Sequence, residues 1–431
     1  MAEKKYQPGS TFADAFNLLQ KDLKERELYE AFYVLRKESP VEELASRLVM
    51  DESPSKILFS GHGKSGKTTE LYRLISDLED TYFVVFYSIL QEMEISDIEY
   101  IDVLLFVALK LWDAALERGV EVDNEVVADF SDWLEQTTSE VTLTRVEEKT
   151  KGLTRGAKLK VLIGEAGASV RTDKTSRDEV RKRLIPRTSE VVERIDILIE
   201  AITQQSGKPP LVIIDDLEKA DLAIGERMFF QHSQSLIRPG CKIVYTVPIS
   251  LIYSGTFRQI DTRFPQPVVL PMIRTRERDG SELLAGIELL KQIILQRVSN
   301  DLLQPDALDH LVKSCNGILS DLLSGAAMCC VKAESRNEKK ITWAMVDEVC
   351  EQFTRTYRRM ILEECYPKLA EVYRTKRTKS DQELRDLLHM LAAIEYEQGA
   401  YYDVHPAIVP ILKEKNLTKD ERDLEKDSPT T

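Results

Sequence analysis

Residues 56–71 read KILFSGHGKSGKTTEL, and this stretch decides the fold. A short apolar run leads into a glycine-rich turn, which is followed by an amphipathic segment. The residues that fit the pattern G-x-x-x-x-G-K-[ST], without a mismatch, are Gly61, Gly66, Lys67 and Thr68. In such a turn the backbone N–H groups point into one concavity that holds phosphate, and the positive end of the following helix adds to the attraction. The stretch therefore predicts a strand, a phosphate-binding loop and a helix.

The side chains of this loop indicate which cofactor it holds. Lys67 can reach the β- and γ-phosphates of a nucleotide, and the Thr68 hydroxyl can ligate Mg²⁺. ATP or ADP with Mg²⁺ is therefore the expected cofactor. The residues expected to line the nucleotide belong to the turn or to the start of the helix: Gly61, His62, Gly63, Lys64, Ser65, Gly66, Lys67, Thr68 and Thr69. A chance match in an ordinary loop is the alternative, and the strand-like and helical flanks weigh against it.

The composition describes a globular protein with more than one domain. A chain of 431 residues exceeds what one core usually supports, so two or three domains are expected. The hydrophobic share is 43% and the charged share is 31%, which is typical of a soluble protein. The formal net charge of −14 at pH 7 indicates that the whole surface does not coat nucleic acid, although local basic patches stay open.

Cysteine, histidine and hydropathy patterns exclude several other classes. The six cysteines include no C-x-x-C pair and the five histidines show no metal-ligand spacing, so buried free thiols in a reducing cytosol are expected. The N-terminal sequence has no apolar core of a signal peptide, and no run of 18 apolar residues occurs. We therefore expect a cytoplasmic protein without a membrane segment.

Four more apolar runs predict the remaining strands of an α/β sheet. They lie at 82–90, 211–215, 242–247 and 268–270. Runs that are apolar throughout are typical of strands buried on both faces of a parallel sheet, and the helical segments among them fit the same class. An insertion at about 95–205 separates the second strand from the third. The predicted elements from the insertion onward are helices at 98–116, 122–134, 176–205 and 223–236, and a small hairpin within 159–171.

Beyond residue 274 the sequence changes to helical periodicity. The predicted helices are 283–297, 305–315, 318–332, 342–362 and 381–396, followed by a short strand at 399–404 and a helix at 405–412. The resulting regions are an N-terminal extension (1–24), a P-loop ATPase domain (25–274), a helical lid domain (275–378), a winged-helix-like unit (379–413) and a charged tail (414–431). The tail is non-periodic, so we expect it to be disordered.

Acidic residues end the third predicted strand, which reads LVIIDDLE at 211–218. A carboxylate at the end of a buried strand can hold Mg²⁺ beside a phosphate loop, and Asp215 fits that role. Asp216 is placed to polarise an attacking water, and Glu218 is the alternative base. These acids supply the second half of a predicted site for ATP hydrolysis.

Taken together, residues 25–335 resemble an AAA+-type P-loop ATPase, nearest to the branch that contains the origin-recognition proteins and the STAND signalling ATPases. The matching segments are GHGKSGKT (61–68), LVIIDDLE (211–218), KIVYTVP (242–248), RQIDTRFPQPVVLPM (258–272) and CNGILSDLL (315–323). The first two are specific, and the others gain weight from their order. The resemblance implies a five-stranded sheet, a helical lid, a nucleotide bound by both, and homo-oligomers in which one subunit's arginine reaches its neighbour's nucleotide.

The resemblance also implies roles for single residues. Thr246 matches the polar residue of the fourth strand that senses the γ-phosphate or aligns water, and an ordinary strand-end hydroxyl is the alternative. Arg263, or else Arg258, matches the arginine that acts across subunits, and a surface arginine is the alternative. Because the segment before the loop often lies against adenine in P-loop ATPases, Tyr33 and Val34 are adenine candidates, with core packing as the alternative.

The lid motif departs from the family pattern. The family often has G-x-x-R at this place, whereas this chain reads Gly317-Ile318-Leu319-Ser320. Without the arginine, stable nucleotide binding with slow or partner-triggered hydrolysis is a live hypothesis.

Two basic stretches are candidate partner sites. One interleaves tyrosines with Arg355, Arg358, Arg359, Lys368, Arg374, Lys376, Arg377 and Lys379. The other reads RTDKTSRDEVRKR at 171–183. Each is a candidate contact for nucleic acid or a partner protein, and a solvated charged helix face is the alternative for both.

Three functions follow from these features. The leading one is a homo-oligomeric AAA+/STAND-like ATPase that acts as a nucleotide-dependent switch or scaffold and controls a separate effector protein. Antiviral defence is implied for it by resemblance alone. The alternative is a DNA-binding ATPase of origin-recognition or transposition-regulator type that uses the winged-helix-like unit. The third is an interaction module that keeps its nucleotide without hydrolysing it.

Overall fold

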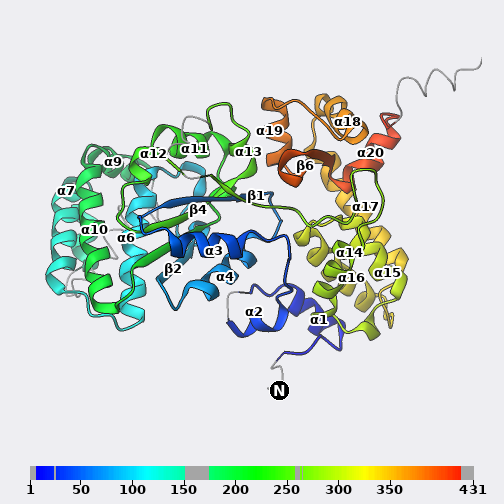
Figure 1. Ribbon diagram of the computed structural model, residues 1–431, viewed down its shortest axis with the longest axis horizontal. Helices are drawn as coiled ribbons and strands as arrows, with labels where there is room; N and C mark the ends of the chain where they lie inside the picture. Colours follow the sequence, from blue (N-terminus) through cyan, green and yellow to red (C-terminus); the bar gives the residue numbers. More distant parts are fainter. Residues whose placement is uncertain (1–5, 24–25, 151–173, 258–262, 265, 419–431) are drawn as a thin grey trace, which may run out of the picture. The chain divides into compact units, whose positions relative to one another are not determined.

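The computed structural model describes the chain apart from residues 1–5, 24–25, 151–173, 258–262, 265 and 419–431 (Figure 1). The hairpin predicted within 159–171 and most of the predicted tail lie outside the described residues. The chain divides into two compact units. The loop-lid unit comprises Met1–Ser39, Gly61–Tyr72 and Val269–Thr431, and the sheet unit comprises Pro40–Ser60 and Arg73–Val268.

A five-stranded parallel sheet of order β2-β3-β4-β1-β5 confirms the predicted fold class. Its strands are β1 (Lys56–Gly61), β2 (Phe83–Ser88), β3 (Pro210–Asp215), β4 (Lys242–Pro248) and β5 (Val268–Leu270). Every residue of β1, β3 and β4 is buried, as the unbroken apolar runs predicted. All five strands lie within or next to the predicted ranges.

Helices cover the sheet and extend from it in the sheet unit. They are α3 (Val41–Met50), α5 (Ile89–Glu92), α6 (Tyr100–Glu117), α7 (Asn124–Thr150), α9 (Lys174–Leu184), α10 (Thr188–Ser206), α11 (Leu222–Glu226), α12 (Ser233–Leu236) and α13 (Ile249–Ile252). Helix α6 packs against β2, β3 and α10, and it is buried on nearly every side. The helices α6, α7, α9 and α10 lie together in Figure 1, coloured cyan to green. The insertion is therefore an extra helical layer with a shared apolar core.

Two helices predicted as continuous are interrupted. The prediction for 176–205 is wrong at Ile185–Arg187, where a short 3-10 turn separates α9 from α10. Pro186 causes the break, because it lacks an N–H donor and its ring clashes with the carbonyl four residues back. The predicted helix at 223–236 contains a wider π-type turn at Arg227–Gln231.

Helices dominate the loop-lid unit, as predicted. They are α1 (Phe12–Leu19), α2 (Arg26–Phe32), α14 (Leu284–Leu295), α15 (Pro305–Cys315), α16 (Leu319–Ser335), α17 (Trp343–Met360), α18 (Tyr366–Thr375), α19 (Gln382–His389) and α20 (Val409–Glu414). Helices α15, α16 and α17 pack on one another, and α1 packs on α16 (yellow and blue in Figure 1). Their apolar faces form one core that includes Leu311, Leu322 and Val346. The helix after the phosphate loop is α4 (Lys67–Leu78). None of the described helices combines the length and apolar character that a membrane span requires.

The C-terminal region corrects one prediction. The helix predicted at 381–396 ends at His389, and Ala393–Tyr396 forms strand β6 instead. Strand β6 pairs antiparallel with β7 (Tyr401–Val404), with Ala393 opposite Val404. The residues AIEY are buried as a group, so pairing in a hairpin satisfies a backbone that sequence periodicity alone placed in a helix. The observed order is α18, α19, the β6-β7 hairpin and α20, where one helix, one short strand and one helix were expected.

Two glycines hold the segment that enters the lid. A Cβ on Gly286 would lie 1.7 Å from the carbonyl oxygen of Arg274. A Cβ on Gly317 would lie 1.8 Å from the carbonyl oxygen of Ile273, and Gly317 has a φ of +88°. Only glycine permits these approaches, so residues 273–274 are packed between α14 and the turn before α16.

Candidate functional site

The phosphate loop is a tight turn closed by its own lysine. The Lys67 ammonium donates to the carbonyl oxygens of His62 at 3.0 Å and Gly61 at 3.3 Å, and the residue is only 4% exposed. Gly66 has a φ of +91°, and a Cβ there would lie 2.8 Å from Leu319 at the start of α16. Lys64 takes a left-handed φ of +64°, which costs energy for a residue with a side chain. The loop therefore holds a strained, pre-formed shape.

Buried polar atoms in this loop fit a bound anion. His62 Nδ1 and Ser65 Oγ have no hydrogen-bond partner among the described residues, and both side chains are buried. Buried polar atoms normally find partners, so such atoms indicate a missing ligand or water. Donors beside an ammonium and a helix N-terminus suit phosphate oxygens. The loop thus fits the triphosphate that its sequence predicts.

Arg36 supports the loop and escaped the sequence analysis. Its buried guanidinium donates to the carbonyl oxygen of Ser65 at 2.8 Å and to that of Pro271 at 2.5 Å. Burial lowers the pKa of Arg36, and the nearby Glu70 charge opposes that shift. Because Arg36 reaches both the loop and the segment that follows β5, it fixes one relative to the other. An arginine in a short apolar segment was the only sequence signal.

The two adenine candidates are placed in other contacts. The Tyr33 ring stacks on Tyr29 with centroids 4.6 Å apart, and its hydroxyl donates to Glu70 at 3.3 Å. Val34 packs against the lid core. Core packing, the stated alternative, describes the contacts of Val34, whereas Tyr33 is half-buried beside Tyr29 and Glu70.

A cavity begins one residue further along the chain. Its volume is about 370 Å³, and its lining includes Leu35, Arg36, Glu38, Arg274, Gly286 and Leu289. Arg36 both lines this cavity and bonds to the phosphate loop, so the cavity lies within one side chain of the loop. Its size suits a small planar ligand.

Three acids gather at the end of β3 in the sheet unit. One oxygen each of Asp215, Asp216 and Glu218 lies within 4.8 Å of the others, which is the spacing of a candidate cation site. Asp215 is buried at the strand end, and its carboxylate accepts from the Asp216 N–H at 2.9 Å. Asp216 has a φ of +68°, so the chain turns sharply there.

Two neighbours orient Asp216. The Ser88 hydroxyl at the end of β2 donates to its carboxylate, and the Lys219 ammonium lies 2.7 Å from it. Thr246, in β4, accepts from the N–H of Leu217 at 3.1 Å and is fully buried. Its hydroxyl therefore holds the turn that carries the acids, which agrees with the strand-end alternative for Thr246.

Only one candidate for the arginine that acts across subunits can be placed. Arg263 is half-buried and donates to the Ser233 hydroxyl at 2.6 Å within its own sheet unit. Arg258 lies outside the described residues. The chain's own contacts therefore leave the choice between these arginines open.

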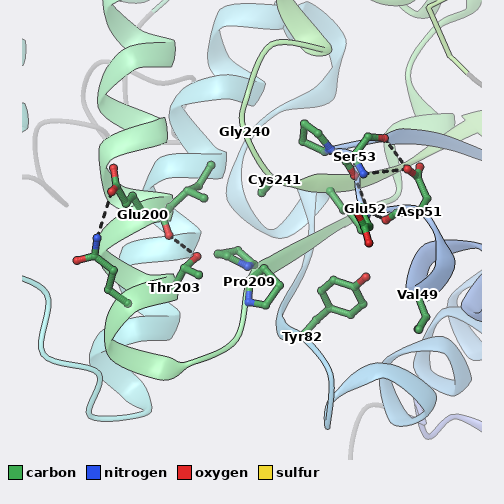
Figure 2. Close-up of a pocket in the computed structure, with 15 residues that line it drawn as sticks. Val49, Asp51, Glu52, Ser53, Tyr82, Glu200, Thr203, Pro209, Gly240 and Cys241 are labelled. Atoms are coloured by element: carbon green, nitrogen blue, oxygen red, sulfur yellow. Dashed lines mark hydrogen bonds between the residues drawn. The ribbon is translucent and has the colours of Figure 1, made fainter.

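A second cavity lies at the amino ends of the strands, opposite the strand ends that carry the phosphate loop and the acids. It has a volume of about 700 Å³ and is lined at the amino ends of strands by Tyr82, Pro210, Lys242 and neighbours that Figure 2 draws. The Lys56 ammonium behind it donates to the carbonyl oxygens of Pro239 and Cys241 at 2.7 and 2.8 Å. Burial lowers the pKa of Lys56 to about 8. Because backbone carbonyls surround this ammonium, Lys56 closes the edge of the sheet and offers no reactive group.

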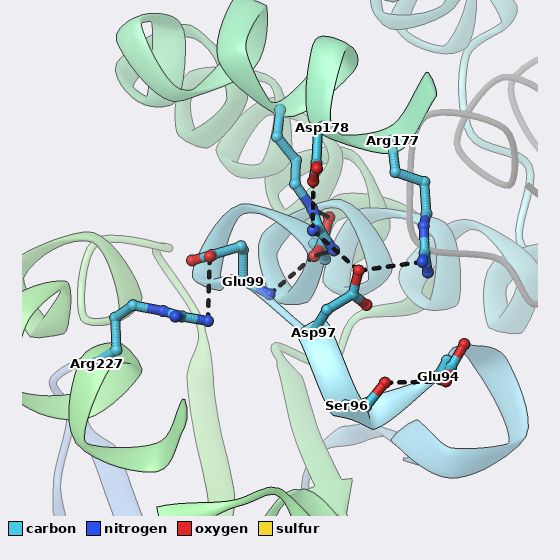
Figure 3. Close-up of polar contacts among 9 residues, drawn as sticks. Glu94, Ser96, Asp97, Glu99, Arg177, Asp178 and Arg227 are labelled. Carbon is cyan, nitrogen blue, oxygen red and sulfur yellow. Dashed lines mark hydrogen bonds and ion pairs between the residues drawn. The ribbon is translucent and has the colours of Figure 1, made fainter. Parts of the chain in front are cut away.

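A buried ion cluster fastens the insertion helix α9 to the rest of the sheet unit (Figure 3). Arg181 donates to both oxygens of Asp102 on α6, at 3.2 and 2.6 Å. Arg177 lies 3.1 Å from Asp97. Arg227, in the π-type turn, lies 3.1 Å from Glu99. Arg177 and Arg181 therefore have carboxylate partners inside the fold, which favours the structural interpretation for this part of 171–183.

Four of the eight basic residues between Arg355 and Lys379 also have carboxylate partners, the first being Arg355, which lies 3.0 Å from Glu351. Lys368 lies 2.8 Å from Asp381, Arg358 lies 2.7 Å from Glu414, and Lys376 lies 2.6 Å from Asp403. These partners agree with the charged-face alternative for half of the stretch.

Comparison with known proteins gives structural similarity only, since no family model and no curated protein matches the chain. The Drosophila ORC bound to DNA aligns at 10% identity over 99% of this chain and 85% of that chain, with a TM-score of 0.41. The Aeropyrum pernix ORC1 protein in complex with DNA aligns at 13% identity, covering 93% and 97%, with a TM-score of 0.40. The Thermotoga maritima RuvB Holliday junction branch migration motor aligns at 12%, covering 92% and 98%, with a TM-score of 0.37. Because these scores lie below 0.5, function is inferred from the chain's own residues.

Those residues define the class. A phosphate loop after β1, acids after β3 and the strand order β2-β3-β4-β1-β5 make this an α/β fold of the P-loop NTPase type with an AAA+-like sheet.

Proposed function

We propose that the protein binds ATP with Mg²⁺ and hydrolyses it, as a nucleotide-dependent switch of the AAA+ type. One observation supports this most directly: β1, β4 and β3 are consecutive in one parallel sheet. The phosphate loop follows the carboxyl end of β1, and the acidic turn follows the carboxyl end of β3. Carboxyl ends of parallel strands share one edge of a sheet, which is where ligands bind in this class.

Each half of the site has a separate task in the proposed reaction. The loop N–H groups and Lys67 bind and orient the phosphates. Thr68 and Asp215 would hold Mg²⁺, which when bound neutralises charge on the terminal phosphates. Asp216, oriented by Ser88 and Lys219, would position and polarise the attacking water, and Glu218 is the alternative. Catalysis would come mainly from positioning and electrostatics.

The base of the nucleotide has a separate candidate site. We assign it to the 370 Å³ cavity lined by Leu35, Arg274 and Gly286, in place of Tyr33 and Val34. The cavity shares Arg36 with the phosphate loop, so one ligand spanning both is consistent with their connection. A substitution Gly286→Val would fill this cavity, although its clash with Arg274 would also disturb the fold.

Calorimetric titration with ATP and Mg²⁺ tests the phosphate site. Lys67→Ala should weaken binding by about 100-fold or more, because charge-assisted bonds to phosphate are lost. Lys332→Met is the matched control, since Lys332 pairs with Glu348 on the lid surface at 2.9 Å. Unchanged affinity in Lys67→Ala would refute the site.

Turnover tests the acids separately. Asp216→Asn and Glu218→Gln, assayed for phosphate release, should show which of the two positions the water: that variant keeps ATP affinity and loses turnover by about 100-fold. Normal turnover in both variants, and in the double variant, would leave the chain a nucleotide-binding module whose water is positioned elsewhere.

A DNA-binding ATPase of origin-recognition or transposition-regulator type is the second candidate. Its support is the order α18, α19 and hairpin, together with the basic residues Arg374, Lys376 and Arg377 around the first turn. The acidic Glu397 in the hairpin turn and the pairing of Lys376 with Asp403 oppose it. A salt-dependent gel shift of duplex DNA that is lost on charge reversal of the three basic residues would establish this function.

The oligomeric state and the biological role are also proposals. A homo-oligomer would need Arg263 or Arg258 at a neighbour's nucleotide, and native mass spectrometry with ATP, ADP or no nucleotide would report the stoichiometry. A separate effector protein and a role in antiviral defence rest on the sequence resemblance, and no described residue bears on them.

A further inference from the structure

Asp321 is the meeting point of two distant parts of the chain within the loop-lid unit. It lies in the first turn of α16 and is almost fully buried. Its Oδ1 accepts from the ammonium of Lys64, in the phosphate loop, at 2.7 Å. Its Oδ2 lies 3.1 Å from Nε2 of His405, which follows β7. Burial alone would raise the pKa of Asp321, but the bonds from His405 and Lys64 lower it, so the carboxylate is charged.

His405 is fixed in one protonation state by its second nitrogen. Its Nδ1 accepts from the backbone N–H of Ala407 at 3.2 Å, so the proton is assigned to Nε2, where it points at Asp321. The ring also stacks on Tyr357, with centroids 4.1 Å apart. Burial lowers the pKa of His405, against the opposing effect of Asp321, and keeps the ring neutral. Lys64 therefore supplies the one full positive charge in this cluster of Lys64, Asp321 and His405.

His62 makes a second connection from the loop. Its Nε2 accepts from the backbone N–H of Glu395 in β6 at 2.8 Å. His62 and Lys64 flank Gly63, so both sides of one exposed turn of the phosphate loop are attached to the C-terminal hairpin region. One attachment is direct, and the other passes through Asp321.

The two attachments differ in how readily a ligand can break them. The His62 side chain is buried, whereas the Lys64 side chain is 45% exposed and carries its charge in the loop that would receive phosphate. A polyphosphate in the loop offers Lys64 a stronger anion than a single carboxylate. Asp321 would then be a buried carboxylate with only the neutral His405 as donor, which is an unfavourable state.

We propose that the Asp321 cluster couples the phosphate loop to the C-terminal hairpin, so that a nucleotide that draws Lys64 away from Asp321 loosens residues 393–405. The regulation rests on the proposed function, since it requires that the loop bind nucleotide. The family pattern has an arginine at the position of Ser320. In this chain the next residue, Asp321, would take part in the response to nucleotide. The lid of this chain responds to nucleotide through an acid and a loop lysine.

Hydrogen–deuterium exchange on the full chain, with and without saturating ATP and Mg²⁺, tests the coupling. In the native protein, ATP should speed exchange in 393–405 by about 10-fold. Asp321→Asn removes the charge but keeps the shape, so exchange there should be fast without ATP and should change less than twofold on adding it. Lys64→Met, at an exposed side chain, should give the same nucleotide-independent pattern without threatening the fold. Lys332→Met is the control on the same helix and should behave as the native protein.

The outcomes separate the coupling from the function on which it rests. If calorimetry detects no ATP binding, the proposed function fails. If ATP binds and exchange in 393–405 does not change, the coupling alone is overturned. A native response to ATP in both Asp321→Asn and Lys64→Met also overturns it.

Discussion

Two buried aspartates organise charge in this molecule, and they do so in different ways. Asp102 in the sheet unit is held by Arg181 through both of its oxygens. Asp321 in the loop-lid unit divides its oxygens between Lys64 and the neutral His405. Burial raises the pKa of Asp102 despite the opposing charge of Arg181, whereas the donors around Asp321 lower its pKa.

The difference separates a fastening contact from an exchangeable one. Arginine stays charged at any relevant pH and matches a carboxylate with two parallel bonds. The Arg181 side chain is also nearly inaccessible, so no ligand can compete for it. Lys64 is accessible and belongs to the phosphate loop. The partner of a buried carboxylate therefore determines whether a ligand can break its ion pair. The burial of the carboxylate does not determine this.

The largest effect should come from breaking the Asp102 cluster. Arg181→Met leaves a buried carboxylate without its cation, which should cost about 3–5 kcal/mol of unfolding free energy. Urea denaturation would measure the loss. Lys182→Met, an exposed neighbour on the same helix, should change stability by less than about 0.5 kcal/mol. Equal stability in the two variants would show that the Asp102 pair does not fasten α9.

Acid should weaken the loop-lid unit by a smaller amount. Burial, helped by the charge of Lys67, lowers the pKa of His62 to about 3, and burial also lowers that of His405. The unfolded chain, with pKa values near 6.5, therefore binds these protons first. Stability from the neutral rings is complete above about pH 6.5 and decreases below it, by up to about 1.4 kcal/mol per pH unit for His62.

Unfolding at pH 7 and pH 5 checks this prediction, because most carboxylates stay ionised over that range. His62→Gln, which keeps a polar group near the Glu395 N–H, should remove the larger part of the pH dependence, because His62 has the strongly lowered pKa. An equal loss of stability on acidification in His62→Gln and the native protein would exclude His62 as a source.

The smallest effect should come from Lys64→Met. Its side chain is 45% exposed, so water can partly take its place beside Asp321, and removing it should cost about 1.4 kcal/mol, which corresponds to the tenfold faster exchange expected at residues 393–405. The same urea experiment should thus rank Lys64→Met far below Arg181→Met, although both remove a cation from a buried aspartate. A loss of 3 kcal/mol or more in Lys64→Met would show that the two clusters are equally structural.

Local sequence was enough to predict the sheet, the phosphate loop and the lid helices α14 to α17, whereas α18 was not predicted. Apolar runs with no alternation identify strands buried on both faces, and GHGKSGKT constrains its own backbone through glycine. Helix α15 was predicted at its observed bounds because proline begins it and helical periodicity runs to Cys315. The break before Thr188 was missed, although Pro186 is a local signal against a continuous helix.

Contacts between distant residues were not readable. Asp321 and Lys64 are 257 positions apart, and His62 and the Glu395 backbone are 333 apart. No periodicity links such positions. The strand at Ala393–Tyr396 was missed for a related reason. Its pairing with β7 determines its conformation, whereas its residues continue the helical periodicity of α19. Arg36 was missed because both groups that it binds are backbone carbonyls, which leave no sequence pattern.

The close packing around residues 273–274 has a mechanical consequence. Gly286 and Gly317 leave this segment no room to slide, and Arg36 bonds both to Pro271 just before it and to Ser65 in the phosphate loop. Residues 271–274 are therefore tied to the phosphate loop by Arg36 and enclosed by the two glycines, so a change in the loop would bear directly on the segment that leads into the lid.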